Sequence, residues 1–572
     1  MSDPDLRPRL EEQSKIESYK AASEHLRGPI VEELESSEPA FTDNAIQVLK
    51  FHGVYQQDDR DLRKQARARG LAKHWQMMMR TRIPGGKVSP EGYLAHDEIA
   101  ERWGNATLRI TTRQDFQLHG ILKDNLRNSI RAINQAMMTT LGGCGDQVRN
   151  VMCCPAPVGD RLRDEIQEAL WNIVGTVTPR TNAYHEIWVD GERVTDAPPG
   201  EEEDLYGDQY LPRKFKIAVA PEGDNCIDIY SNDLGLVAMR DDDGGLAGFN
   251  LLVGGGLGRT HHKPNTYPAV GRLLGFVPAD RVEEVTRAVI TVQRDNGDRA
   301  NRRHARLKYL LADRGLDWFR EQVQERLSFP LEEGRPLHWH GVDDHLGWHR
   351  QQDGRWFYGL FVENGRIKDE GEYRLRSAMR QIVTELRPTL WLTAQQNVLF
   401  ADLEESAKPR LRRILALHGV PLTSSIPLAV RNSMACPAIP TCGLAVAESE
   451  RVLPQVIREL AAVQEELGLA RERISVRMTG CPNGCARPYL GDIGFVGTTL
   501  GKYDVYLGGD FEGTRLNIPY SHNVGQEELV PLLRPLLEAF VKERNRKEGF
   551  GDWCHRLGVA YLQHRFQVLA TA

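Results

Sequence analysis

Apolar and polar residues alternate most regularly along residues 108–120, which read LRITTRQDFQLHG. A period of two predicts a β-strand with one polar face. Two other segments, 268–297 and 453–468, place their apolar residues at helical spacing. Strands and helices follow one another without a regular β-α-β rhythm, so the pattern favours the α+β class.

Two pairs of segments repeat at a single offset. LRITTRQD at 108–115 matches LWLTAQQN at 390–397, and RNVMCCPA at 149–156 matches RNSMACPA at 431–438. The shared offset is 282 positions, which is far too long for a solenoid repeat. We therefore expect an internal duplication, with two similar halves packed about a pseudo-twofold axis and a site between them.

Composition narrows the class of protein. The 572 residues are 41% hydrophobic and 27% charged, which is typical of globular domains. The net charge of −6 gives no reason to expect nucleic-acid binding. The polar N-terminus and the absence of a long apolar run predict neither a secretory signal nor a membrane span. Nine cysteines is a low, odd count that suits a reducing compartment, and we expect the cytoplasm.

Four cysteines carry the clearest chemistry. Cys436 and Cys442 are spaced C-x5-C, and Cys481 and Cys485 are spaced C-x3-C around Pro-Asn-Gly. Two tight pairs of thiolates are suited to an iron–sulfur cluster, and the turn residues bring the last two sulfurs together. Structural zinc and a chance arrangement remain alternatives, although zinc sites favour pairs closer than C-x5-C.

The cysteine pattern, with TGCPNGC around its second pair, resembles the signature of siroheme-dependent sulfite and nitrite reductases. FHGVYQQDDRDLR at 51–63, LPRKFK at 211–216 and GFNLLVGGGLG at 248–258 resemble the hemoprotein subunits of assimilatory NADPH–sulfite reductases. The resemblance implies a [4Fe–4S] cluster on the four cysteines, with Cys485 also bridging to the iron of a siroheme. It implies the six-electron reduction of sulfite to sulfide.

Further site residues follow from the same resemblance. Arg80, Arg149, Lys214 and Lys216 are implied to bind sulfite and to donate protons. Taken singly, each has a second interpretation as a solvated surface charge. Arg109, Arg113, Gln117 and His119 are all odd-numbered, so one strand would place them on one face. The resemblance implies that this face binds the siroheme carboxylates, whereas the alternative is a solvent-facing strand. Asn483 is expected to shape the turn beside the cluster.

The other cysteines are expected to be buried small residues and not ligands. Cys154 takes the repeat position of Cys436, and the first half is expected to have no counterpart of Cys442, Cys481 or Cys485. Arg306 or Lys308 is expected to add contacts to the cofactor carboxylates.

No nicotinamide- or flavin-binding fingerprint is present, because Arg259 replaces the last glycine that the segment from Gly254 would need. Electrons must therefore come from another protein: a separate flavoprotein subunit carrying FAD and FMN or, as an alternative, ferredoxin. A ferredoxin-dependent sulfite or nitrite reductase is the nearest rival, and a non-catalytic iron–sulfur or zinc scaffold is a rival from another class.

Three domains are expected from the duplication and the resemblance. The predicted parts are an N-terminal arm (1–77), a central domain made from 78–141 and 347–423, a first large domain (142–346) and a cluster-binding domain (424–572). Residues 1–45 are expected to be a partly extended arm outside the core.

Overall fold

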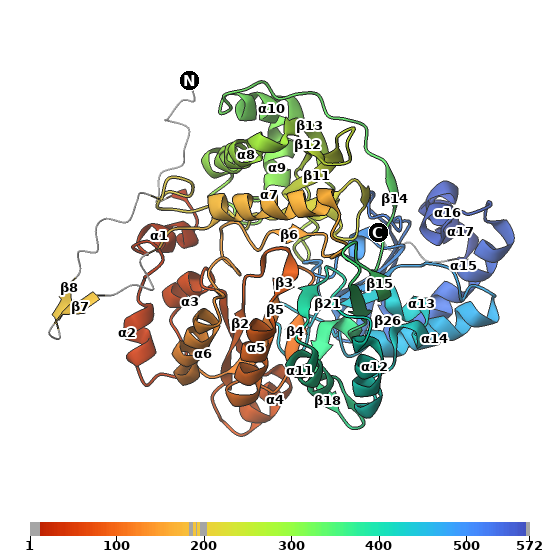
Figure 1. The fold of residues 1–572 in the computed structure, drawn as a ribbon, viewed down its shortest axis with the longest axis horizontal. Coiled ribbons are helices and arrows are strands. Elements are labelled where there is room, and N and C mark those ends of the chain that lie inside the picture. Colours follow the sequence, from red (N-terminus) through yellow and green to blue (C-terminus); the bar gives the residue numbers. More distant parts are fainter. Residues whose placement is uncertain (1–11, 182–186, 190–191, 195–202, 568–572) are drawn as a thin grey trace.

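Two antiparallel sheets form the centre of the molecule and exchange one strand each. The computed structural model describes residues 12–181, 187–189, 192–194 and 203–567 (Figure 1). The first sheet has the order β1 (Val54–Asp58), β2 (Trp75–Arg80), β5 (Phe116–Ile121), β4 (Leu108–Ile110), β17 (Arg366–Ile367). The second has the order β15 (Gly347–Arg350), β16 (Trp356–Leu360), β21 (Val398–Leu403), β20 (Thr389–Leu392), β3 (Lys87–Val88).

The exchanged strands show the duplication directly. β17 comes from the second half and pairs with β4, while β3 comes from the first half and pairs with β20. One hydrophobic core extends across both sheets. The helices that cover them are α5 (Pro90–Arg102), α6 (Lys123–Gln135), α11 (Leu375–Leu386) and α12 (Ala407–Leu417). α5 begins where sequence signals place it, because Ser89 caps the Gly92 N–H and Pro90 fills the first turn.

Two larger sheets share a single topology. In each, three parallel strands are followed by two antiparallel ones. The first-half sheet has the order β6 (Met152–Cys153), β9 (Ile217–Pro221), β11 (Leu234–Arg240), β12 (Leu246–Val253), β13 (Arg272–Pro278). The second-half sheet has the order β22 (Ser433–Ala435), β23 (Val476–Thr479), β24 (Ile493–Thr499), β25 (Lys502–Leu507), β26 (Ile518–Gly525).

Helices cover each larger sheet and close a separate core around it. In Figure 1 the first-half lobe lies at the top and the second-half helices lie at the right. The first lobe contains α7 (Arg161–Val177), α8 (Val282–Asn296), α9 (Leu307–Arg314) and α10 (Leu316–Gln324). The second contains α13 (Leu428–Arg431), α14 (Leu453–Glu466), α15 (Leu529–Glu543), α16 (Phe550–Leu557) and α17 (Val559–Arg565).

A buried ion pair joins the halves at equivalent positions. Asp228 and Arg487 both have a left-handed backbone and both precede a short 3-10 turn, at 229–231 and 488–490. The Asp228 carboxylate binds the guanidinium groups of Arg487 and Arg477. Arg487 also donates to the carbonyls of Thr112, at 2.9 Å, and Ala394, at 2.8 Å. It therefore fixes one hairpin loop from each central sheet.

Two expectations about secondary structure need correction. Residues 108–120 form a hairpin of β4 and β5, not one strand, because the polar residues 111–115 make a turn. Residues 272–278 form strand β13, and only 282–296 of that segment are helical. The short apolar run before Pro278 is buried by pairing with β12. The helical expectation for 453–468 is confirmed by α14.

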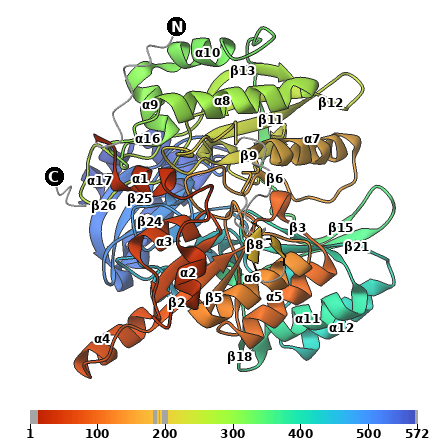
Figure 2. The same cartoon turned by 90° about the vertical axis from the view of Figure 1, so that its left-hand side faces the viewer.

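The N-terminal region is also not an extended arm over its described residues. It contains α1 (Lys15–Ala21), α2 (Ile30–Glu35), α3 (Asp43–Leu49) and α4 (Arg60–Ala68), with α4 projecting outward in Figure 2. Leu26 is fully buried in the first-lobe core. Lys20 is buried because its Nζ binds Glu17 at 2.6 Å and the Leu211 carbonyl at 2.8 Å. These contacts order a polar sequence that lacks its own apolar pattern. The domain boundaries given above remain predictions.

Three two-stranded pairs complete the strands: β7 (Ile187–Val189) with β8 (Glu192–Val194), β10 (Gly223–Asp224) with β14 (Trp339–Gly341), and β18 (Asp369–Glu370) with β19 (Tyr373–Arg374). Among the described helices, none combines the length and the apolar composition needed to cross a membrane.

Candidate metal-cluster site and cationic pocket

The four motif cysteines gather at one edge of the second large sheet. Cys436 directly follows β22, and Cys481 follows the neighbouring parallel strand β23 by two residues. Parallel neighbours end at the same edge, so the two sulfurs are brought to one side. The Gly480 N–H donates to Cys436 Sγ at 3.3 Å.

The turn between Cys481 and Cys485 is tightly supported. Gly484 has a φ of +65°, and a Cβ there would lie 3.0 Å from the Tyr489 ring. Asn483 Nδ2 donates to Cys481 Sγ at 3.5 Å, a contact that fits its expected place in the turn. The glycine-rich segment of the first half packs on the other side, since Arg259 N donates to the Pro482 carbonyl at 3.0 Å.

The motif cysteines lie close enough to change the pKa values of Cys436 and Cys481, but they are not arranged around one metal ion. Burial raises the pKa of Cys481 to about 12, and neighbouring Cys485 and Cys442 contribute to the rise. Burial likewise raises the pKa of Cys436, with Cys485 as the next cause. Within the described part of the chain, no three of these sulfurs lie within 4.8 Å of one another. One zinc ion needs sulfurs about 3.8 Å apart, given its short Zn–S bonds, so these sulfurs as placed do not form a site for a single zinc ion.

Cys485 faces the first half of the chain. It is exposed, unlike the buried Cys436 and Cys481, and its carbonyl accepts from Thr112 Oγ1 at 2.9 Å. Burial opposes the charge on Arg80, but Cys144, Cys485 and other acidic groups raise the pKa of its guanidinium overall. Cys485 also tends to raise the pKa of Lys214, against the larger effects of burial and of neighbouring cations. Residues far apart in sequence therefore meet at the open side of the cysteine group.

Lys214 and Lys216 lie on either side of Phe215, which bridges to Val148 beside Arg149. Burial lowers the pKa of Lys214 to about 7, and the cations Arg213, Arg306 and Arg149 lower it further. Burial, then Arg113 and Lys214, lowers the pKa of Lys216 well below its usual value. Cations crowded in this way are stabilised by a bound anion.

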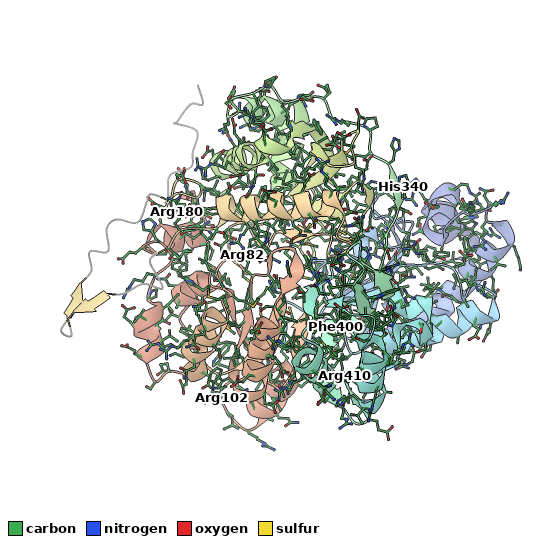
Figure 3. The ribbon with its side chains drawn as sticks, in the orientation of Figure 1. Arg82, Arg102, Arg180, His340, Phe400 and Arg410 are labelled. Atoms are coloured by element: carbon green, nitrogen blue, oxygen red, sulfur yellow. The ribbon has the colours of Figure 1, made fainter. Side chains whose placement is uncertain are left out.

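Arg80 and Arg82 do not share partners, although they are two residues apart. Arg80 donates to Cys144 Sγ at 3.1 Å, and its Nε donates at 3.1 Å to the Gln117 amide oxygen when that amide faces it. Arg82 donates to Thr178 Oγ1 at 2.8 Å, just after α7 (Figure 3). Only Arg80 is thus joined to the predicted cofactor-binding residues.

The proposed carboxylate-binding face is only partly as expected. Arg109 and Gln117 are opposite each other on β4 and β5, and His119 follows on the same face. Arg113 instead lies in the turn and donates to the Asn150 carbonyl at 3.0 Å and to Asn232. Arg109 is bound to Glu450 at 3.1 Å and to the Ala435 carbonyl at 2.8 Å.

On this face, the His119 ring lacks a hydrogen-bond partner among the described residues. Its ring nitrogens are buried, whereas buried polar groups are normally satisfied. Burial, then Arg366, lowers the pKa of His119 well below 6.5, so the ring is neutral at pH 7. Arg306 and Lys308 are already bound, Arg306 to Asp233 at 2.7 Å and Lys308 to the Gly258 carbonyl at 2.8 Å.

Two groups beside these cations, Asp115 and Tyr55, were missed by sequence reasoning. Burial raises the pKa of Asp115 to about 7, although Arg80 and Arg113 oppose the rise. Burial and Cys144 raise the pKa of Tyr55, against the effect of Arg149 and Arg80. The only sequence signal was that Asp115 ends the repeated LRITTRQD segment.

The residues present fit the implied groups. Four converging thiols suit an iron–sulfur cluster. The half-buried cations Arg80, Lys214 and Lys216, with Arg149 and an imidazole that has no partner among the described residues, suit a large carboxylate-bearing ligand. Fold and site together define a class of redox protein: a duplicated α+β scaffold with one cysteine-lined cluster site facing a cationic pocket.

Comparisons identify the family within this class. The model described as "Nitrite and sulphite reductase 4Fe-4S domain" matches residues 168–331 and 429–568. The model described as "Nitrite/Sulfite reductase ferredoxin-like half domain" matches 73–136 and 349–418. The chain belongs to the nitrite and sulfite reductase family, and the predicted family and fold class are confirmed.

Individual relatives agree with the family models. The sulfite reductase [NADPH] hemoprotein beta-component of Staphylococcus carnosus is 44% identical, over 95% of both chains. The sulfite reductase [ferredoxin] of Synechococcus elongatus is 45% identical, over 96% of this chain and 90% of its own length. The solved structure of the NirA protein of Mycobacterium tuberculosis has a TM-score of 0.78 at 26% identity, covering 97% of this chain and all of its own.

Proposed function

We propose that this protein reduces sulfite to sulfide, with siroheme beside a [4Fe–4S] cluster held by Cys436, Cys442, Cys481 and Cys485. The observation that carries the proposal is the pocket of Arg80, Arg149, Lys214 and Lys216 at the open side of Cys485. When bound, the two groups supply electrons and the iron at which sulfite reacts. Cys485 is the thiolate proposed to belong to both, because it is the exposed member of its set.

The pocket residues have separable roles in this proposal. Arg149 is 8% exposed, and its Nε donates at 2.8 Å to the Gly145 carbonyl, which leaves the rest of its planar fork for an oxyanion. Lys214, with a pKa of about 7, is suited to give up a proton near neutral pH. Asp115, also with a pKa of about 7, lies beside Arg80, Arg113 and Arg149 and can itself hold or release a proton near neutral pH. Arg80 is positioned by its hydrogen bonds to Cys144 Sγ and to the Gln117 amide oxygen.

His119, Arg109, Arg113 and Asn483 are proposed to lie along the cofactor. His119 is the one expected to bond a siroheme carboxylate directly, because its nitrogens have no partner among the described residues. Arg109 and Arg113 act by positioning, since Arg109 ties β4 to Ala435, next to Cys436, and Arg113 ties the loop to Asn150.

The electron donor is proposed to be a separate FAD- and FMN-containing subunit, and the protein is proposed to act in the cytoplasm in assimilatory sulfur metabolism. The names of the staphylococcal and cyanobacterial relatives support an NADPH-linked flavoprotein and ferredoxin, respectively, at nearly equal identity. The residues YQQDDRD at 55–61 favour the first. Family membership argues against a non-catalytic scaffold.

The test uses the purified full chain with its iron bound. With reduced methyl viologen as one-electron donor it should convert sulfite to sulfide, while NADPH alone should not be oxidised. Adding a flavoprotein reductase should restore NADPH-dependent turnover. An iron-loaded chain that forms no sulfide, or that oxidises NADPH without flavin, would overturn the proposal. Turnover of nitrite far above that of sulfite would favour the rival activity.

A further inference from the structure

A second group of metal-binding side chains lies in the first half, outside the cluster site. The ligand atoms of Cys154, Asp224, Cys226 and His345 all lie within 4.8 Å of one another. Cys154 Sγ is 3.9 Å from Asp224 Oδ2 and 3.8 Å from His345 Nε2, and those two atoms are 3.5 Å apart. Cys154, Cys226 and His345 are buried, with Cys226 fully so.

These separations are those of a four-coordinate ion. Bonds of about 2.3 Å to sulfur and about 2.0 Å to nitrogen or oxygen give tetrahedron edges of about 3.3–3.8 Å. The separations of 3.5 and 3.8 Å fall within this range, and 3.9 Å lies just above it. The four motif cysteines, in contrast, are too widely spaced for one ion. Two thiolates, an imidazole and a carboxylate form a donor set that Zn²⁺ accepts.

The surrounding hydrogen bonds aim the donors inward. Asp224 Oδ1 accepts from the backbone N–H groups of Cys226 and Asp343, both at 3.1 Å, which leaves Oδ2 for the centre. His345 Nδ1 is 3.5 Å from Asp343 Oδ2, while its Nε2 faces Cys154. A carboxylate behind a histidine is the usual support of a metal-ligating imidazole.

The group occupies the duplicated copy of the cluster position. Cys154 matches Cys436 at the offset of 282. Cys226 matches Cys485, because each stands three residues before a 3-10 turn and eight before an equivalent strand, β11 or β24. The expectation that the first half lacks a counterpart of Cys485 is therefore wrong. The expectation that Cys154 and Cys226 merely fill the core omitted Asp224 and His345.

We propose that Cys154, Asp224, Cys226 and His345 bind one Zn²⁺, which pins the connector carrying Asp343 and His345 to the first large sheet. The second half holds the same connector from its other side, since Arg431 pairs with Asp344 and Arg473 donates to the Val342 carbonyl. A cavity of about 900 Å³, lined by Asp224, His345 and His340, gives the ion a path to the site. Figure 3 labels His340 at this junction.

The test measures zinc in the full, iron-loaded chain, purified with a reductant and dialysed against Zn²⁺-free buffer. Elemental analysis should find about one zinc per chain, and zinc-edge X-ray absorption should show about two sulfur and two lighter neighbours. Four sulfur neighbours would place the ion in the motif-cysteine site and overturn the proposal. A reduced chain that retains no zinc after incubation with Zn²⁺, or that keeps a Cys154–Cys226 disulfide, would do the same.

Variants test the assignment residue by residue. Cys226→Ser and His345→Ala should each lower bound zinc at least tenfold while iron and acid-labile sulfide per chain stay constant. Asp343→Asn, which removes only the support of the imidazole, should weaken zinc binding by about 10–100-fold and is the variant most certain to fold. Lys263→Ala, on the exposed surface of the same lobe, is the control. Unchanged zinc in both His345→Ala and Asp343→Asn would overturn the proposal.

Discussion

The loops that carry Cys485 and Cys226 share one backbone conformation but lie in opposite surroundings. Cys485 is exposed and faces Arg80 and Lys214, whereas its equivalent Cys226 is fully buried beside Asp224. The duplicated scaffold thus fixes the positions of the cysteines, and the side chains around each cysteine determine which metal group it can bind. Fold alone would assign the two loops the same role, but the residues at the sites do not.

The arginines of the repeat show the same contrast. Arg149 and Arg431 occupy equivalent positions in the RN segments. Arg149 lies among cations and has no salt-bridge partner within the described residues, whereas Arg431 Nη2 is paired with Asp344 at 2.5 Å. In the second copy the chain supplies its own carboxylate to Arg431, whereas Arg149 of the first copy is proposed to bind an anion. The proposed anion site therefore belongs to one half.

The largest expected effect distinguishes the two loops. Cys485→Ser should abolish sulfite reduction and disturb the heme absorption, because the proposed shared ligand is lost. Cys226→Ser should keep the iron content and the heme spectrum of the wild type. Absorption spectra and iron analysis of the two purified variants check this. A normal heme spectrum with full activity in Cys485→Ser would refute the bridging assignment.

Next in size is the proton donor. Lys214→Ala should lower kcat by about 10²–10⁴-fold, the range for general acids, with a smaller change in the KM for sulfite. With a pKa of about 7, Lys214 is protonated below that pH, so the wild-type rate should fall as the pH rises through it. Lys214→Arg should not restore the rate, because guanidinium keeps its proton. pH–rate profiles provide the measurement, with Lys263→Ala as the matched control; an unaltered profile in Lys214→Ala would exclude this role.

The ion pair between the halves should matter for stability. Asp228→Ala leaves Arg477 and Arg487 buried without their carboxylate and should cost about 3–5 kcal/mol. Burial opposes the charge, yet the two arginines hold the pKa of Asp228 below its usual 3.8. Its contribution is therefore present above pH 3.8 and lost as the pH falls through the lower folded value. Urea titration of both variants gives the loss in the free energy of unfolding, and Asp353→Ala, which breaks an exposed pair with Arg355, should cost far less than Asp228→Ala. Equal losses would contradict the account.

The smallest effect concerns substrate affinity. Arg149→Ala should weaken sulfite binding by about one to two powers of ten, the loss of about 1.5–3 kcal/mol in a charge-assisted hydrogen bond. Iron and heme content should not change. Arg161→Ala, an exposed arginine at the start of α7, is the control. Spectral titration with sulfite gives the Kd, and equal affinities in both variants would remove Arg149 from the pocket.

Several features of the fold and the site could be predicted from the sequence because they depend on residues close together in the chain. The duplication, the cysteine spacing and α14 follow from patterns within short segments. The single-strand expectation for 108–120 failed because period-two alternation does not reveal a turn at 111–115 between two short strands. The N-terminal helices were missed because burial of Lys20 depends on distant partners such as Leu211.

The copy of the cluster site was hidden for a different reason. The halves differ in length between their repeats, so the offset changes from 282 at Cys154 to 259 at Cys226, and one fixed offset cannot find both. Asp224 and His345 have no repeat signal at all. Their meeting depends on the path of the connector after β14, which only the folded chain shows.

Sulfurs at equivalent positions are proposed to hold a multi-iron cluster in one half only. The most direct measurement is acid-labile sulfide and iron per chain in Cys436→Ser and Cys154→Ser. The wild type should contain about five irons and about four labile sulfides. Cys436→Ser should lose the labile sulfide and about four irons, and Cys154→Ser should retain both. Retention in Cys436→Ser together with loss in Cys154→Ser would contradict the account.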